Sequence, residues 1–255
     1  MKLIDTHCHL YLEEFKQDLH SVIERAKKTG VEKFYLPAID SSEINNMLSL
    51  EALLPQQCIA MMGLHPCSVK ENYQAELALV EGWLHKRKFA AIGEIGLDFY
   101  WDKTFMDQQY EAFKIQMQWA LEKHIIIVIH TRNAMQETID TVKPFSQKGL
   151  SGIFHCFSGN FENAKEIIDM GFLLGIGGVV TYKNSGLAEV VEKIDLKHIV
   201  LETDAPYLTP VPFRGKRNES SYLQFIVKKL AEIKNISEEE VAAITTANAE
   251  KIFGG

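Results

Sequence analysis

The sequence predicts an α/β protein, a (β/α)8 TIM barrel with an additional C-terminal helix. Short runs rich in Val, Ile and Phe alternate with longer amphipathic segments along all 255 residues, without a Pro/Gly/Ser-rich linker between them. Eight such units match the usual length of this barrel. We therefore expect a single domain, residues 1–255, whose chemical residues lie at one rim, where strands end and loops begin.

The elements follow one another in a regular order. The predicted strands cover residues 2–7, 31–39, 58–64, 89–95, 125–130, 151–157, 172–178 and 198–204. After the first strand, apolar residues from Phe15 to Ala26 recur at helical spacing, and the segment ends at Gly30, a suitable C-cap. No glycine-rich turn follows the first strand, which disfavours a doubly wound open sheet, the main alternative. A Ser237/Glu240 capping box begins the additional C-terminal helix.

Composition and charge restrict the class of protein. The chain has 46% hydrophobic residues and a formal net charge of −7. This acidic balance argues against broad coating of nucleic acid, so a polyanionic substrate needs a local basic site. The four cysteines lack CxxC spacing, and no apolar stretch approaches membrane-spanning length. We expect a cytoplasmic protein that is a monomer, with reduced thiols and no membrane partner.

Histidines and carboxylates are concentrated where predicted strands end. In "IDTHCHL", alternation along a strand would place His7 and His9 on one face. The other residues at this rim are His65, Glu94, His130, His155 and Asp204. Satisfied core histidines are the alternative, but these would not favour strand ends.

Six of these side chains exceed what one tetrahedral ion can use, so we expect two divalent ions. The six expected ligands are His7, His9, Glu94, His130, His155 and Asp204. A carboxylate can bridge such a pair of ions, and a shared water of lowered pKa would supply hydroxide as the nucleophile. Asp5, Asp98 and Glu202 lie two or four residues from these ligands, and we expect them to orient ligands or pair with a cation rather than bind metal directly.

Six ordered motifs carry a resemblance to a known family. They are "DTHCHL", "GLHP", "GEIGLDFYW", "IHTR", "FHCFSG" and "ETDAPYLTPVPFRGKRNE". Together they resemble the TatD family of metal-dependent deoxyribonucleases, within the amidohydrolase-like barrel group.

The resemblance implies a distribution of the ligands between two ions. His7, His9 and Asp204 would hold one ion, His130 and His155 the other, and Glu94 would bridge them. Asp204 is also our first choice for the general base, which makes Asp204 and Glu94 the candidate catalytic residues. The family is usually magnesium-dependent, whereas imidazole-rich ligands favour zinc or manganese.

Candidate substrate-binding residues lie at the same rim. Arg214, Lys216 and Arg217 place three cations on the loop after the last strand, a recurrent phosphate site in these barrels. A solvated charged loop is the alternative. Arg132 shares a face with His130 and can reach substrate. His65 is expected to contact a phosphate or leaving group, or to support the site structurally.

Three further features of the loops concern substrate choice. The aromatic run Phe99 to Trp101 follows Glu94 and either stacks on a base or covers the barrel. Asn133 stands where the family frequently has aspartate, which removes a charge. Ser220 replaces a usual proline, so the loop after the cations is expected to be less rigid.

The leading hypothesis is a two-metal phosphodiesterase that hydrolyses DNA, and also RNA, as a 3'-5' exonuclease or repair-type nuclease. A C–N or ester hydrolase of small molecules is the alternative within the barrel group. A non-catalytic nucleic-acid or metal-binding protein is the third hypothesis, which the complete ligand set disfavours.

Overall fold

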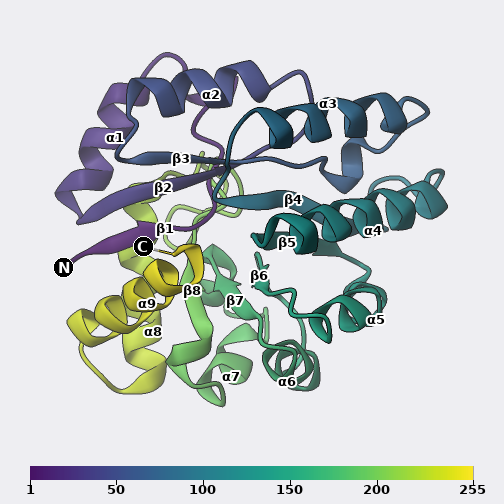
Figure 1. Cartoon of the computed structure of the whole chain (residues 1–255). Coiled ribbons are helices and arrows are strands. Elements are labelled where there is room, and N and C mark those ends of the chain that lie inside the picture. Colours follow the sequence, from purple (N-terminus) through teal and green to yellow (C-terminus); the bar gives the residue numbers. More distant parts are fainter. Residues whose placement is uncertain (255) are drawn as a thin grey trace.

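The computed structural model describes residues 1–254 and confirms the predicted barrel (Figure 1). Its parallel strands are β1 Leu3–Asp5, β2 Val31–Pro37, β3 Cys58–Met61, β4 Ala91–Asp98, β5 Ile126–Arg132, β6 Gly152–Phe154, β7 Leu173–Ile176 and β8 Ile199–Leu201. Strands β1 to β3 form one ladder in chain order and β4 to β8 form another. The bridges Met62–Ile92 and Cys8–Ala205 join the two ladders and close the barrel.

Helices surround the strands on the outside, as Figure 1 shows. They are α1 Leu19–Lys28, α2 Ile44–Leu53, α3 Tyr73–Lys86, α4 Met106–Lys123, α5 Met135–Ser146, α6 Phe161–Asp169, α7 Leu187–Glu192, α8 Leu223–Lys234 and α9 Glu238–Phe253. The predicted end of the first helix is confirmed, because Gly30 follows α1 with a φ of 93°, which glycine adopts without steric cost. None of the helices in residues 1–254 combines the length and apolarity needed to span a membrane.

Helix α9, the predicted additional helix, covers the amino-terminal ends of the first and last strands. Asn248 donates hydrogen bonds to the carbonyls of Leu196 and Ile199, and Thr246 donates one to the carbonyl of Lys2. Ser237 caps the helix by accepting from the N–H of Glu240 at 3.1 Å. In the part of the chain that the structure describes, the reciprocal bond of the predicted capping box is absent.

Two apolar clusters hold the barrel together. The larger lies between strands and helices, whereas the smaller fills the barrel interior. The interior cluster comprises Ile4, Tyr35, Met61, Ala91, Val128, Ile153, Val200 and Ala249. Since Ala249 lies on α9, and Phe253 stacks on Tyr35 with 3.7 Å between centroids, this helix plugs the mouth opposite the predicted rim.

Several strands differ in length from the prediction. β1 ends at Asp5, although the chain beyond it still bonds to β8, as in the 3.0 Å bond from the N–H of Thr6 to the carbonyl of Leu201, the last residue of β8. β4 continues to Asp98, so Glu94 lies inside this strand and not at its end. The pairing of β4 with β5 shifts register between Ile92 and Ile95, which surrounds Glu94 with an irregularity.

Candidate metal centre

The structure brings the six predicted metal ligands and His65 together at the carboxyl-terminal rim of the strands. They come from distant parts of the chain, and Glu94 lies at the middle of the group. The side chain of Glu94 is 3% exposed. Its two carboxylate oxygens face two different sets of donors.

The first set faces Oε2 of Glu94. Nε2 of His7 lies 3.1 Å from this oxygen, and Nε2 of His9 lies 3.7 Å from it. Oδ1 of Asp204 lies 3.7 Å and 3.6 Å from the same two nitrogens. These spacings suit ligand atoms that would hold one cation between them.

The second set faces Oε1 of Glu94. Nδ1 of His130 lies 2.8 Å from it, Nε2 of His155 lies 3.0 Å from it, and Nε2 of His65 lies 3.3 Å from it. His65 was predicted as a substrate or supporting residue, and the structure places its ring nitrogen among the donors of this second set. His65, Glu94 and His130 offer ligand atoms that lie within 4.8 Å of one another.

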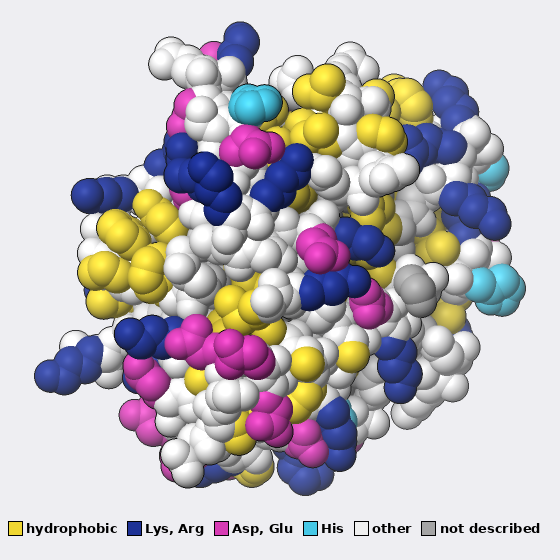
Figure 2. Space-filling view, turned by 90° about the vertical axis from the view of Figure 1, so that its left-hand side faces the viewer, with side chains coloured by type: hydrophobic (Ala, Val, Ile, Leu, Met, Phe, Trp, Pro, Cys, Tyr) yellow, Lys and Arg dark blue, Asp and Glu magenta, His cyan; other side chains and the backbone are white. Residues whose placement is uncertain are grey.

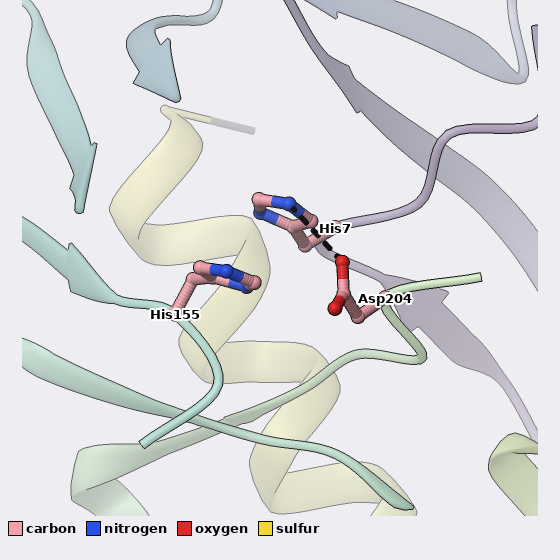
Figure 3. A group of neighbouring side chains, drawn as sticks. All are labelled: His7, His155 and Asp204. Atoms are coloured by element: carbon pink, nitrogen blue, oxygen red, sulfur yellow. Dashed lines mark ion pairs between the residues drawn. The ribbon is translucent and has the colours of Figure 1, made fainter. Parts of the chain in front are cut away.

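Asp204 reaches the site through an unusual backbone conformation. Its φ is 57°, in the left-handed region, and its N–H donates to the carbonyl of His7 at 2.9 Å. Figure 3 shows the Asp204 carboxylate beside His7, with the His155 ring alongside. The rings of His7 and His155 stack with 3.7 Å between centroids. Non-glycine residues adopt this conformation mainly where the surrounding structure imposes it, often at functional sites.

Neighbouring groups fix the orientation of His9 and of the second-set histidines His130 and His155. The Tyr11 hydroxyl donates to the carbonyl of Pro37 at 2.5 Å and accepts from Nδ1 of His9 at 2.9 Å, which leaves Nε2 of His9 free for metal. Nε2 of His130 donates to Asp98 at 2.9 Å, which leaves Nδ1 facing Glu94. Fixing the tautomer of a ligand histidine in this way is the usual role of groups behind a metal site.

His155 has a corresponding partner in Glu202. Nδ1 of His155 lies 3.2 Å from Oε1 of Glu202, which also accepts from the N–H of Cys156 at 2.5 Å. Glu202 is fully buried. The structure therefore places Asp98 beside His130 and Glu202 beside His155, whereas Asp5 accepts hydrogen bonds from the N–H and hydroxyl of Thr203 and supports the backbone of the site.

Tyr11 and Gln109 are supporting residues that the sequence analysis did not identify. Gln109 on α4 accepts from the N–H of Asp98 and donates to its carbonyl, at 2.8 and 3.1 Å. Tyr11 lies two residues past His9, so the alternation used for His7 and His9 could have been extended to find it. Gln109 carries no such signal, because it lies on a helix.

The charges at the centre favour the ionised form of Glu94 and the protonated form of His155. Burial raises the pKa of Glu94, but the charges of His155, His65 and His7 outweigh this and hold it well below its usual range. Burial lowers the pKa of His155, but Glu94 and Glu202 outweigh this and raise it well above its usual range. The carboxylates of Glu94 and Glu202 thus favour positive charge at the position of His155.

The donor set fits divalent metal ions. Both ring nitrogens of His7 are buried and lack a hydrogen-bond partner within residues 1–254, which is costly unless something else binds them. His7, His9 and Glu94 form one group with ligand atoms within 4.8 Å of one another, and His7, His155 and Asp204 form another. Imidazole nitrogens and carboxylate oxygens together suit zinc, manganese and related ions.

The structure separates the predicted substrate-binding cations. Arg217 forms two hydrogen bonds to Asp18, at 2.9 and 2.7 Å, and stacks over Phe15. Arg214 instead lies over the ring of Tyr182, 4.2 Å from its centroid, and Lys216 lies near Phe213. Arg214 and Lys216 form no ion pair within residues 1–254, so they are the cations of this loop that remain available to a phosphate.

The two departures from the family pattern take defined structural places. Asn133 has a φ of 53°, a left-handed conformation that asparagine tolerates well. Ser220 is fully buried and begins a short 3-10 helix, Ser220–Tyr222, ahead of α8. The helix after the cationic loop thus begins with this extra turn.

Comparison with known proteins gives a consistent result. The TatD related DNase family matches residues 4–254. An uncharacterised metal-dependent hydrolase of Bacillus subtilis (strain 168), YabD, is 40% identical over 253 residues, with 98% of each chain covered. A protein of Erwinia tasmaniensis named 3'-5' ssDNA/RNA exonuclease TatD is 30% identical, covering 98% of this chain and 99% of its own. The crystal structure of a TatD homologue from Escherichia coli K12, YJJV, superposes with a TM-score of 0.93 at 28% identity, covering 99% of this chain and 98% of its own.

Proposed function

The chain belongs to the TatD family of metal-dependent hydrolases, and from this premise we propose that it hydrolyses phosphodiester bonds at the ends of DNA, and also of RNA. The Erwinia relative, which is named as a 3'-5' exonuclease of single-stranded DNA and RNA, supports this choice of substrate and the same polarity.

One observation carries the proposal: the two oxygens of Glu94 face two sets of nitrogen and oxygen donors. Two divalent ions would be held by Glu94 together with His7, His9 and Asp204 on one side and His130 and His155 on the other. When bound, such ions would lower the pKa of a water molecule and neutralise charge on the phosphate. Zinc, manganese or magnesium could fill this role.

The residues around the ions have separate roles in the proposed reaction. The side chain of Asp204 is 14% exposed, so it can both hold a metal and accept a proton from water that enters the site. Burial raises the pKa of Asp204, but hydrogen bonding to His9 and the charges of His155 and His7 keep it below its usual range. Asp204 is thus ionised at neutral pH, as a general base must be.

Two cations and one histidine are proposed to bind the substrate. Arg214 can bind a phosphate through two parallel hydrogen bonds, while Lys216 contributes a point charge. His65 reaches the second donor set and can contact a phosphate oxygen there. On the face drawn in Figure 2, basic and acidic side chains are interspersed, and this mixed surface, like the net charge of −7, disfavours broad coating of nucleic acid.

The test combines elemental analysis of purified protein with digestion of end-labelled single- and double-stranded DNA in a panel of divalent metals. We expect hydrolysis that requires metal and is lost in Asp204→Asn, which keeps the shape and the tolerance of a left-handed φ. Turnover by metal-free protein, or full activity of Asp204→Asn, would refute the mechanism.

A second measurement distinguishes the bond that is cleaved. The double variant Arg214→Ala/Lys216→Ala should weaken phosphodiester hydrolysis and leave hydrolysis of a neutral amide or ester unchanged. Efficient amide or ester hydrolysis without any nuclease activity would instead establish the alternative, a C–N or ester hydrolase.

A further inference from the structure

The loop after β4 exposes two aromatic side chains beside the metal centre. Tyr100 is 51% exposed and Trp101 is 68% exposed, whereas Phe99, which precedes them, is 5% exposed and packs below. The rings of Tyr100 and Trp101 are nearly perpendicular, with 4.9 Å between centroids. Large aromatic rings with this exposure contribute little to the core, so their position calls for another role.

Arg132 is stacked on this aromatic pair. Its guanidinium carbon lies 3.9 Å from the Tyr100 centroid and 5.1 Å from the Trp101 centroid. In the described chain, residues 1–254, this guanidinium has no ion pair and no hydrogen bond. Stacking therefore holds its plane while its N–H donors remain available, and a guanidinium in that state suits a phosphate.

One buried carboxylate joins the aromatic loop to a metal-ligand candidate. Oδ1 of Asp98 accepts from the N–H groups of Tyr100 and Trp101, at 2.9 and 3.1 Å, and its Oδ2 accepts from Nε2 of His130 at 2.9 Å. The N–H of Phe99 also donates to the carbonyl of Arg132 at 2.9 Å. The loop is thus fixed relative to the metal centre, which lowers the entropy cost of binding a ligand on it.

From these contacts, and resting on the proposed function, we infer that Tyr100, Trp101 and Arg132 form a subsite for one unpaired nucleotide. The base stacks on Trp101 and the guanidinium of Arg132 donates to an adjacent phosphate. A base inside a duplex hides both faces between its neighbours, whereas an unpaired base can leave the stack and present a face to the tryptophan. The subsite therefore selects a single-stranded or frayed end of any sequence, because every base has a π-face.

The test compares Trp101→Ala with Leu79→Ala, which removes a similarly exposed apolar side chain, 49% exposed, from α3. Substrates are an end-labelled single strand and the same strand with abasic sites near its end. We expect Trp101→Ala to raise KM about tenfold, within roughly 5- to 150-fold for one stacked base, with little change in kcat. Abasic sites should raise the wild-type KM similarly and add nothing further in Trp101→Ala. Leu79→Ala should match wild type.

Arg132→Lys provides an independent measurement, because it keeps the charge but loses the planar group. It should raise KM on both substrates. An unchanged KM in Trp101→Ala, or a full additional effect of abasic sites in that variant, would overturn the subsite while leaving the nuclease activity established.

Binding separates failure of the subsite from failure of the proposed function. The probe is a phosphorothioate-linked oligodeoxynucleotide, and the signal is quenching of the fluorescence of the exposed Trp101. Trp101→Phe is the control, because it leaves only the fluorescence of Trp83 and Trp119, which are partly buried. Quenching that disappears in Trp101→Phe, in a protein that cleaves no nucleic acid, supports the subsite and refutes the nuclease. Absence of quenching in wild type overturns the subsite whatever the activity.

Discussion

Replacing Gly175 with alanine should weaken metal binding without touching a ligand. Gly175 lies on β7 with an ordinary φ, so alanine costs nothing in the backbone. Its new Cβ, however, would lie 2.2 Å from Oε2 and 2.7 Å from Cδ of Glu202. Because Glu202 is fully buried, its carboxylate must shift by about 1 Å within a closely packed interior.

The size of the effect follows from what Glu202 contacts. The shift would break or lengthen the 3.2 Å contact with Nδ1 of His155. Loss of such a supporting contact typically costs 10- to 100-fold in metal affinity, or about 1.4 to 2.8 kcal/mol. Overpacking would additionally lower the free energy of unfolding by about 1 to 3 kcal/mol.

Gly177 provides a matched control two residues away. A Cβ at Gly177 would meet the carbonyl oxygen of Glu202 at 3.4 Å and its Cγ at 3.7 Å, which are ordinary contacts. Titration of metal-free protein with Mn²⁺ or Zn²⁺ should show weakened binding in Gly175→Ala and near wild-type binding in Gly177→Ala.

The variant Glu202→Gln tests whether the effect passes through this carboxylate. Gly175→Ala should add little to the loss of metal affinity that Glu202→Gln already causes, since both act on the same contact. Wild-type affinity in Gly175→Ala, or equal losses in both glycine variants, would show that Glu202 does not support His155 as argued.

Three further predictions concern protons and charges. In metal-free protein, Glu94 and Glu202 outweigh the effect of burial and raise the pKa of His155, so a metal ion that binds this histidine must displace a proton. The affinity for metal should therefore rise with pH. Calorimetry in buffers of different ionisation enthalpy should detect the release of the proton. Burial raises the pKa of Asp5 to about 6, so the folded state holds this proton more tightly than the unfolded state. The Asp5 contribution to unfolding free energy should therefore fall by about 2 kcal/mol between pH 4 and 6, and denaturant titrations of Asp5→Asn should lack this decline. Arg217→Ala should destabilise the protein by only about 1 kcal/mol, since its ion pair with Asp18 is partly exposed. The same substitution should leave the KM of nuclease activity unchanged. A rise in KM as large as that in Arg214→Ala would instead show that Arg217 binds substrate.

The fold could be predicted because each unit of the barrel repeats one local pattern. The clustering of the expected ligands could also be predicted, since His130 lies near the end of β5 and His7, His9, His155 and Asp204 lie beyond the ends of their strands. Parallel strands carry such positions to one rim whatever their separation in sequence.

The features that could not be predicted depend on tertiary contacts, which leave no local pattern in the sequence. Glu94 lies inside β4 because this strand continues to Asp98, and no apolar pattern marks the register shift of the ladder around it. Arg217 forms an ion pair with Asp18, which lies 199 positions away in the sequence, so no local pattern around Arg217 predicts this pair. The aromatic run could be located on a loop, but only the structure separates buried Phe99 from exposed Trp101.

The dispersion of the ligands along the chain has a consequence for biosynthesis. The first donor set joins His7 to Asp204, and the backbone bond between these residues closes the barrel. A nascent chain therefore carries its earliest histidines for most of translation before their carboxylate partner emerges from the ribosome. In the proposed arrangement, binding of the first ion would therefore wait until the last strand docks, so that a nearly complete fold rather than an unfolded peptide would select the metal.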